Sequence, residues 1–405
     1  MPEIDGKKNL KRISVDQVEV GMYCEDVFNE HDVLILSAHI PIATEDQIQL
    51  LRNLGVKTLE IDLTKGKDVY QKPVAAVAVP QKPLYIPLVE ELPRAREVYS
   101  RTIETARSAL KAIRLGQSFP MEQIETMVEE ILESIIRNPD ALMSLSQIRG
   151  YDEYTYEHSV NVSILVCSLA HALNLEKEVI LQGGVGGLLH DIGKTWIPEH
   201  IVNKPGKLTD PEYTIMKRHP EYGIEIVKDR KGISDLSKTV IIQHHERING
   251  KGYPHLLKSD EIHDMGLMAG IVDVYDAMTS NRVYRPAFTP QQSLATIYNG
   301  IGQEYPKTIS EHFIKLMGVY PVGSFVKLHS GEMGIVTRVN RDDILAPDML
   351  ILFSGDGQKL AEPYECQLAK TIGKKGNKTG IEKSVNPRAY GIDVAEFIKG
   401  KISVL

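Results

Sequence analysis

The sequence contains little cysteine, a single tryptophan and no long apolar run. Its three cysteines, Cys24, Cys167 and Cys366, are far apart in 405 residues, and no two of them form a CxxC pair. We therefore expect reduced, incidental thiols rather than a disulfide framework. The net charge of −7 at pH 7 argues against a general nucleic-acid-binding surface, although it leaves room for a local basic pocket.

A membrane span is not expected either. The most apolar stretch with a helical pattern, residues 160–175, includes Asn161, Ser163 and His171 and is too short to cross a bilayer. The first residues are polar and do not resemble a secretory leader. These features predict a cytoplasmic protein that does not bind membranes.

Local patterns predict a mainly α-helical protein with two smaller parts rich in β-structure. Strands are expected near residues 18–20, 33–36 and 57–62, with a helix over 45–54. Apolar residues from Met121 to Ile136 recur at three- and four-residue spacing, which predicts a helix that ends at Asn138-Pro139. The chain therefore divides into a small α+β domain (1–65), a proline-rich linker (66–92), connecting helices (93–149), a helix bundle (150–320) and a β-rich extension (321–405).

Potential metal ligands recur along the predicted bundle, about one helix and its connection apart. Helices of a bundle can bring one such group each to the same depth. A lone histidine on an apolar helix is more often a core residue, but an aspartate in an apolar run needs a partner. The residues concerned are His158, His190, Asp191, His219, His244, His245 and Asp273.

The chemistry of this set predicts two transition-metal ions. Nitrogen and oxygen ligands without a thiolate suit iron, manganese, nickel or zinc, and they do not suit calcium. His190 and Asp191 are adjacent, and neighbouring helical side chains point about 100° apart. The pair is therefore awkward for one ion but suits two, with the Asp191 carboxylate as a bridge.

Four motifs in this region resemble the HD-GYP domain, a bacterial subgroup of the HD metal-dependent phosphohydrolases. They are LLHDIGK at 188–194, KPGKLTDPEYTIMKRHP at 204–220, HHERINGKGYP at 244–254 and DVYDAMTSNRVYRP at 273–286. The resemblance implies an HD-type helix bundle that hydrolyses cyclic di-GMP to linear pGpG, and in some members to GMP. It assigns the same seven ligands, with Asp191 as the bridge. The N-terminal segment resembles the small domain of unknown function that often precedes HD-GYP domains.

Three positions depart from the fullest family pattern. Members with a third metal have a glutamate where this chain has Tyr154, so two ions are expected here. The usual aspartate of the loop before GYP is Asn249, and the usual bulky aromatic is Ile248. Both changes leave the ligands intact and bear on substrate contacts and turnover.

The expected mechanism is attack by hydroxide. Two cations about 3.5–4 Å apart lower the pKa of a shared water to about 7, and the hydroxide attacks phosphorus in line with the 3′ oxygen. Lys194 is the candidate for stabilising charge or protonating the leaving group, with a solvated helix-terminal lysine as the alternative. Arg282 and Arg285 are candidates for binding phosphate or guanine, or lie on the surface. Tyr253 either contacts substrate or braces its loop.

Two other functions fit the same residues. One is hydrolysis of a different cyclic dinucleotide, because nothing in the sequence fixes the base. The other is a slow-turnover sensor or scaffold that binds cyclic di-GMP, with the N-terminal domain contacting signalling proteins. DNA is not an expected partner in any of these cases.

Overall fold

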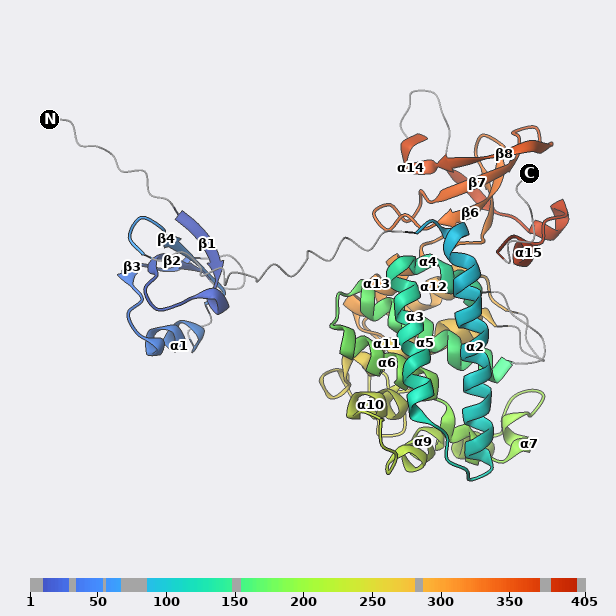
Figure 1. Cartoon of the computed structure of the whole chain (residues 1–405), viewed down its shortest axis with the longest axis horizontal. Coiled ribbons are helices and arrows are strands. Elements are labelled where there is room, and N and C mark those ends of the chain that lie inside the picture. The colour runs from blue at the N-terminus through green and yellow to red at the C-terminus, as the bar shows by residue number, and fades with distance from the viewer. Residues whose placement is uncertain are drawn as a thin grey trace. The chain divides into compact units, whose positions relative to one another are not determined.

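The computed structural model describes residues 10–28, 34–53, 56–66, 86–147, 154–280, 287–371 and 380–398. The chain forms two compact units, Met1–Lys82 and Pro83–Leu405 (Figure 1). The first is a small sheet with one helix, and the second is a helix bundle with a sheet at the C-terminal end of the chain. This confirms the predicted fold class, a mainly α protein with small β-rich parts. The limits predicted for the five segments stay predictions.

The N-terminal unit is a four-stranded antiparallel sheet in the order β1-β4-β2-β3. Its elements are β1 (Leu10–Ser14), β2 (Tyr23–Phe28), β3 (Leu34–Pro41), α1 (Glu45–Asn53) and β4 (Thr58–Asp62). Ile13, Leu59 and Ile61 from the sheet and Ile48 from α1 share one core. This confirms the predicted helix and the predicted strand near residues 57–62.

The strand predicted over residues 18–20 was wrong. These residues lie between a 3-10 turn, Val15–Gln17, and the start of β2. Gly21, with φ of 102°, turns the chain there, a backbone conformation that favours glycine. Val18 and Val20 favour an extended backbone, but among the described residues this segment does not pair with a neighbouring strand.

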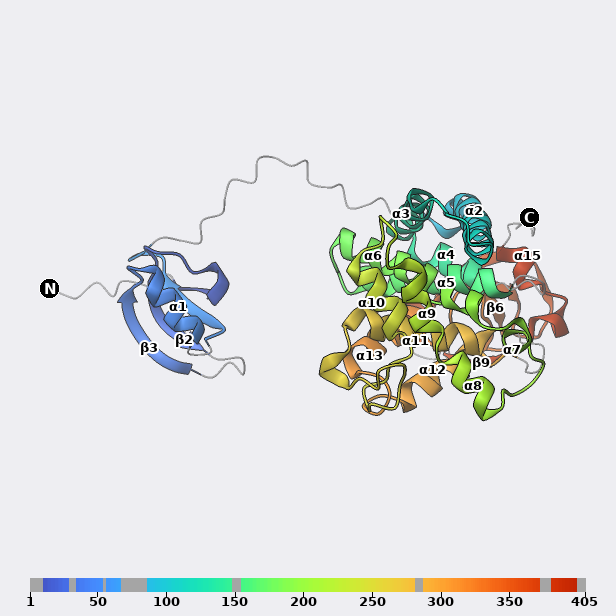
Figure 2. The same ribbon diagram turned by 90° about the horizontal axis from the view of Figure 1, so that it is seen from below.

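The helices of the second unit follow one another through most of its length. They are α2 (Leu88–Arg114), α3 (Met121–Arg137), α4 (Pro139–Ser146), α5 (Tyr154–Ala172), α6 (Lys177–Leu189), α7 (Glu199–Val202), α8 (Asp210–Met216), α9 (His219–Val227), α10 (Asp235–Gln243), α11 (Asp264–Thr279), α12 (Pro290–Asn299) and α13 (Lys307–Met317). The helix predicted from the apolar stripe is α3, and it ends at Asn138 as expected. α2 begins before Pro93, within the segment predicted as a linker. Figure 2 shows α2 and α3 side by side on one face of the bundle.

The centre of the bundle is α5, which is buried on all sides from His158 to Ala170. α6 approaches it closely through its glycines. A Cβ atom on Gly184 would lie 2.4 Å from Cys167 Sγ of α5, and one on Gly186 would lie 2.6 Å from Val240 Cβ of α10. These close contacts with α5 and α10 fix the helix that leads to His190.

The C-terminal sheet is antiparallel, with strand order β8-β7-β6-β5-β9. Its elements are β5 (Phe325–Leu328), β6 (Met333–Arg338), β7 (Asp348–Phe353), β8 (Lys359–Gln367), α14 (Leu368–Thr371), β9 (Ile381–Ser384) and α15 (Val394–Ile398). These strands confirm that the C-terminal part of the chain is rich in β-structure, as predicted. Arg341 Nη2 donates to the buried Asp140 at 2.6 Å, and this ion pair joins the sheet region to α4. Among the described residues, no helix is both long and apolar enough to cross a bilayer.

Candidate metal centre

The histidine–aspartate pair lies where α6 ends. His190 is the C-cap of α6, and Asp191 leads into the 3-10 helix η2 (Ile192–Trp196). η2 runs directly against the start of α9, because a Cβ atom on Gly193 would lie 1.9 Å from the carbonyl oxygen of His219. Only glycine permits this approach. It brings Asp191 Oδ1 to 3.3 Å from His219 Nε2.

Three of the histidines are oriented by backbone carbonyls of the preceding turn of chain. The Nδ1 atoms of His190, His219 and His244 donate to carbonyl oxygens three residues earlier, at 2.7, 2.8 and 2.9 Å. A neutral imidazole carries one N–H, so in its neutral form each ring has its proton on Nδ1 and a lone pair on Nε2. The Nε2 atoms of His219 and His244 lie only 3.2 Å apart. Two lone pairs at this separation fit a shared cation.

The seven predicted ligands come together as two groups of ligand atoms, each within 4.8 Å. Group one is His158, His190 and Asp273, and group two is Asp191, His219, His244 and His245. In group one, Asp273 Oδ1 lies 3.1 Å from His158 Nε2. These residues come from α5, the end of α6, the start of α9, the end of α10 and α11. Their role as ligands stays a prediction.

Asp191 lies between the two groups. Its Oδ1 is 3.3 Å from His219 Nε2 and 3.9 Å from His244 Nε2. Its Oδ2 is 3.4 Å from His190 Nε2 and 3.8 Å from His158 Nε2. The two oxygens of one carboxylate therefore face different groups, which is the arrangement of a bridging ligand.

The buried atoms of this site fit a metal ion. Within the described part of the chain, Asp191 Oδ1 and His190 Nε2 are buried and have no hydrogen-bond partner. Buried polar atoms are normally paired, and those left over need an explanation. Here the surplus atoms are acceptors of nitrogen and carboxylate type, the ligands that transition metals prefer.

The two carboxylates are ionised despite their burial. Burial opposes ionisation of Asp191, but the charge of Lys194 helps to hold the pKa of this carboxyl well below its usual value. Burial likewise opposes ionisation of Asp273, yet its contact with His158, whose Nε2 lies 3.1 Å from Oδ1, helps to hold its pKa well below the usual value. Both side chains can therefore offer charged oxygens at neutral pH.

The imidazoles of His244 and His245 are neutral. Burial, reinforced by neighbouring histidines, lowers the pKa of each well below its usual value. Metal ligands must be neutral imidazoles or ionised carboxylates. These two histidines and the two carboxylates are thus in the protonation states that a metal ion requires.

Lys194 lies directly beside the carboxylate between the groups. Its Nζ is 2.5 Å from Asp191 Oδ2, and its side chain is partly exposed on η2. A helix-terminal lysine directed only at solvent would not make this contact. The structure thus places a cation at the edge of the candidate site, next to the oxygen that faces group one.

Tyr253 lies on the loop after α10 and covers group two. Its ring stacks on His245, with centroids 4.5 Å apart and an interplanar angle of 28°. The buried Glu246 shapes this loop by accepting from the backbone N–H groups of His255 and Leu257 at 2.7 and 3.0 Å. Gly252 is required in the turn, since a Cβ atom there would lie 2.4 Å from the backbone of Glu246. Tyr253 therefore rests against a candidate ligand, whatever its contact with substrate.

Two predicted substrate-binding residues, Arg282 and Arg285, lie outside the described residues. In contrast, Asp276 was missed by the sequence reasoning although it belongs to the site. It is buried on α11 and accepts from His158 Nδ1 at 2.7 Å. The signal was present as a second aspartate three residues after Asp273, on the same apolar helix.

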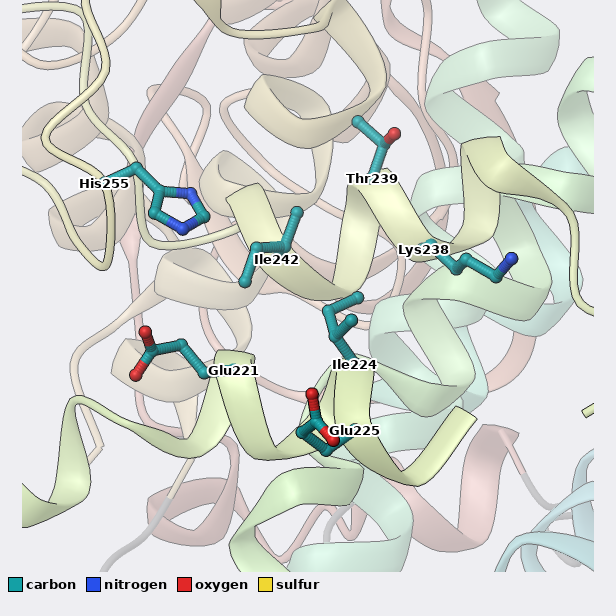
Figure 3. A pocket seen from close by; sticks show the side chains of 7 residues that line it. All are labelled: Glu221, Ile224, Glu225, Lys238, Thr239, Ile242 and His255. Carbon is teal, nitrogen blue, oxygen red and sulfur yellow. The ribbon is translucent and has the colours of Figure 1, made fainter. Parts of the chain in front are cut away.

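A separate hollow opens between the outer faces of α9 and α10 (Figure 3). Ile224 and Ile242 lie on facing helices, and His255 and Glu221 lie at one end. None of the seven candidate ligands lines it. This hollow is therefore not the candidate metal centre.

Comparisons with known proteins agree with this geometry. A family model described as an HD domain matches residues 126–309, and a domain of unknown function, DUF3391, matches residues 10–124. The cyclic di-GMP phosphodiesterase PA4108 of Pseudomonas aeruginosa is 36% identical over 357 residues, covering 85% of this chain and 86% of the relative. The chain belongs to the HD-GYP family of phosphodiesterases.

Other HD-GYP relatives match shorter stretches. A cyclic di-GMP phosphodiesterase of Vibrio cholerae is 40% identical over 132 residues, 31% of this chain and 27% of the relative. The 3'3'-cGAMP-specific phosphodiesterase 2 of the same organism is 30% identical over 223 residues, 53% of this chain and 42% of the relative. The solved structure of Bd1817, a HDG"Y"P protein from Bdellovibrio bacteriovorus, is 18% identical, covers 75% of this chain and 98% of its own, and has a TM-score of 0.47.

Proposed function

We propose that this HD-GYP protein hydrolyses cyclic di-GMP to linear pGpG with two divalent transition-metal ions, one at each group of ligand atoms. The observation that carries the proposal is the position of Asp191. One of its oxygens lies 3.3 Å from His219 Nε2 in group two, and the other lies 3.4 Å from His190 Nε2 in group one. A carboxylate serving one ion would not need both oxygens directed at separate sets of nitrogens.

His158, His190 and Asp273 would hold one ion, and His219, His244 and His245 the other, with Asp191 shared. When bound, the ions acidify water and stabilise negative charge on phosphoryl oxygens. Iron, manganese, nickel and zinc all fit this ligand set. The chain contributes ligands whose rings are oriented by hydrogen bonds, as those of His158, His190, His219 and His244 are.

Lys194 is proposed to act on the reacting phosphodiester. Its ammonium lies 2.5 Å from Asp191 Oδ2, at the edge of the ligand groups. From there it can pair with a phosphoryl oxygen or donate a proton to the departing 3′ oxygen. Tyr253, whose ring stacks on His245, is proposed to contact a guanine base through its aromatic ring. Arg282 and Arg285 are proposed to bind phosphate or guanine.

Cyclic di-GMP is proposed as substrate because PA4108 and the Vibrio cholerae relative that matches over 132 residues are named as phosphodiesterases of this nucleotide. Hydrolysis of 3'3'-cGAMP is the second candidate, because a relative of 30% identity is named for that substrate. The two nucleotides share phosphodiester chemistry and differ in one base. The metal centre alone does not distinguish them.

A slow-turnover sensor would also use this centre to bind a nucleotide, with the N-terminal unit passing the signal to a partner. The loop argues for turnover. Asn249, in place of the usual aspartate, still accepts a hydrogen bond from the backbone N–H of Lys251 at 2.9 Å, so it caps the turn as an aspartate would.

We propose a cytoplasmic location, because the cysteines among the described residues are free thiols.

The test is a turnover assay on the anaerobically purified protein, loaded separately with iron, manganese, nickel or zinc. Cyclic di-GMP, 3'3'-cGAMP and cyclic di-AMP are compared by chromatography of the products. We expect pGpG from cyclic di-GMP with at least one metal, further conversion to GMP being followed in the same runs. A fully metal-loaded protein that binds cyclic di-GMP tightly and forms no product would refute the enzyme and favour the sensor.

A further inference from the structure

The imidazole of His158 has a carboxylate from the same turn of α11 beside each of its ring nitrogens. Asp276 Oδ2 accepts from Nδ1 at 2.7 Å, and Asp273 Oδ1 lies 3.1 Å from Nε2. Residues three apart on a helix share a face, so both carboxylates reach α5 from the same side. Asp276 and His158 are both buried, which removes competing water from their contact.

This support differs from that of the other three oriented histidines. His190, His219 and His244 donate from Nδ1 to backbone carbonyls three residues earlier in the chain. A carboxylate partner makes the opposite ring nitrogen a stronger electron-pair donor than a neutral carbonyl does. His158 is therefore the one of these four histidines whose donor strength depends on a replaceable side chain.

The two groups of ligand atoms also differ in charge. Group one contains Asp273 and has Asp276 behind His158, whereas the carboxylate of group two is Asp191 alone. Lys194 offsets part of the charge near group one, because it pairs with Asp191 Oδ2. Two carboxylates besides Asp191 still leave group one the more negative, and a divalent cation is attracted more strongly there.

We propose that Asp276 is a positioning residue that orients His158 and makes group one the tighter of two unequal metal sites. The proposal rests on the proposed metal centre, although not on the identity of the nucleotide. It predicts that group two loses its ion first. It also predicts that replacing Asp276 weakens group one in particular, by about 10- to 100-fold in metal affinity, the usual effect of removing such a partner.

The first test is the Asp276→Asn variant, which keeps the side-chain volume but replaces the carboxylate with an amide. Metal content is measured against a graded chelator, with Asp276→Glu as the conservative variant. The control is Asp140→Asn, since Asp140 is equally buried and pairs with Arg341 instead of a candidate ligand. Unfolding temperatures of the metal-free proteins separate a loss of metal from a loss of folding.

We expect Asp276→Asn to lose its more tightly held ion at about 10- to 100-fold lower chelator strength. Asp276→Glu should recover part of the lost metal affinity. Asp140→Asn should release metal at the same chelator strength as the wild-type protein. Unchanged chelation of a folded Asp276→Asn protein would overturn the positioning role. Equal loss of metal in Asp140→Asn would also overturn it, because a general effect of buried charge would then explain the result.

The second test uses the wild-type protein and so does not depend on the folding of any variant. Crystals are treated with limiting chelator, and anomalous scattering locates the ion that remains. Retention among His158, His190 and Asp273 supports the proposal. Retention among His219, His244 and His245 overturns it while leaving a two-metal enzyme intact, and a wild-type protein that holds no ion overturns both proposals.

Discussion

Buried carboxylates meet imidazoles in two regions of this chain, and they are neutralised in different ways. In the N-terminal unit, the buried Glu25 lies 2.5 Å from His39 Nδ1 and 2.8 Å from Lys65 Nζ. Lys65 also lies 3.3 Å from Asp62 Oδ2. In the helix bundle, the corresponding atoms are histidine lone pairs and carboxylate oxygens, and acceptors outnumber donors.

The balance of donors and acceptors distinguishes a metal centre from an ordinary buried ion pair. In the N-terminal unit the chain supplies its own cation, so a metal ion would have to displace Lys65. In the bundle, Lys194 pairs with one oxygen of Asp191 while the other oxygen has no hydrogen-bond partner among the described residues. An added cation stabilises the second arrangement and not the first.

The largest difference between the regions should come from removing one carboxylate in each. We expect Asp191→Asn to abolish hydrolysis and to release metal, because it removes the ligand shared by both groups. Glu25→Gln should leave turnover and metal content at the wild-type level. Turnover assays and metal analysis of both variants check this, and undiminished hydrolysis by Asp191→Asn would remove the mechanism.

A strong effect is also expected from the backbone contact that brings Asp191 to His219. In Gly193→Ala, the new Cβ would lie 1.9 Å from one backbone atom of α9 and 2.5 Å from another, so the helix must move. We expect a loss of about 1–3 kcal/mol in the free energy of unfolding, together with weaker metal binding.

The matched control is Gly380→Ala, where the nearest atom to the new Cβ would be 3.6 Å away. Denaturant unfolding and chelator titration of both variants provide the measurement. Equal behaviour of Gly193→Ala and Gly380→Ala would show that the approach of η2 to α9 is not required.

A moderate effect is expected from Lys65→Met, which removes the internal cation of the N-terminal unit. Glu25 and Asp62 would then be buried with less compensation. Because Lys65 is 43% exposed, we expect a loss of stability smaller than the full cost of breaking a buried pair. Unfolding of the N-terminal unit is measured, with Lys65→Arg as the control. No loss of stability would mean that Glu25 and Asp62 do not depend on the charge of Lys65.

The smallest expected effect is on the stability of the N-terminal unit at acidic pH. Hydrogen bonds from Thr64, opposed by burial, lower the pKa of Asp62 below its usual 3.8. The unfolded chain therefore binds a proton before the folded one does, and the stabilisation present above about pH 4 is lost as the pH falls through the lower, folded pKa. The stability of the N-terminal unit should fall in this range, and Asp62→Asn should flatten the decline. An unchanged acid slope in that variant would assign the effect to other groups.

The sequence predicted the site best where potential metal ligands recur about one helix and its connection apart. The seven candidate ligands were found from their spacing, because bundle helices must present side chains inward at similar depth. The start and end of α3 followed from Met121, Asn138 and Pro139, since apolar periodicity and a proline are local signals.

Contacts between distant segments could not be predicted in the same way. The bond between His158 and Asp276 joins residues 118 positions apart and depends on how α5 and α11 are rotated against each other. The contact of Lys194 with Asp191 depends on η2, a 3-10 helix whose geometry the sequence did not indicate. Local propensity also gave a wrong prediction, the strand over residues 18–20. Its valines favour β-structure, but a strand needs a pairing partner as well as suitable residues.

The most direct test of the account is the metal-to-protein ratio of the folded wild-type chain, purified without oxygen and saturated with iron or manganese. Elemental analysis by mass spectrometry should find two ions per chain, bound without any nucleotide. A fully folded protein that retains fewer than one ion per chain under these conditions would contradict the claim that its surplus of buried acceptors is a metal centre.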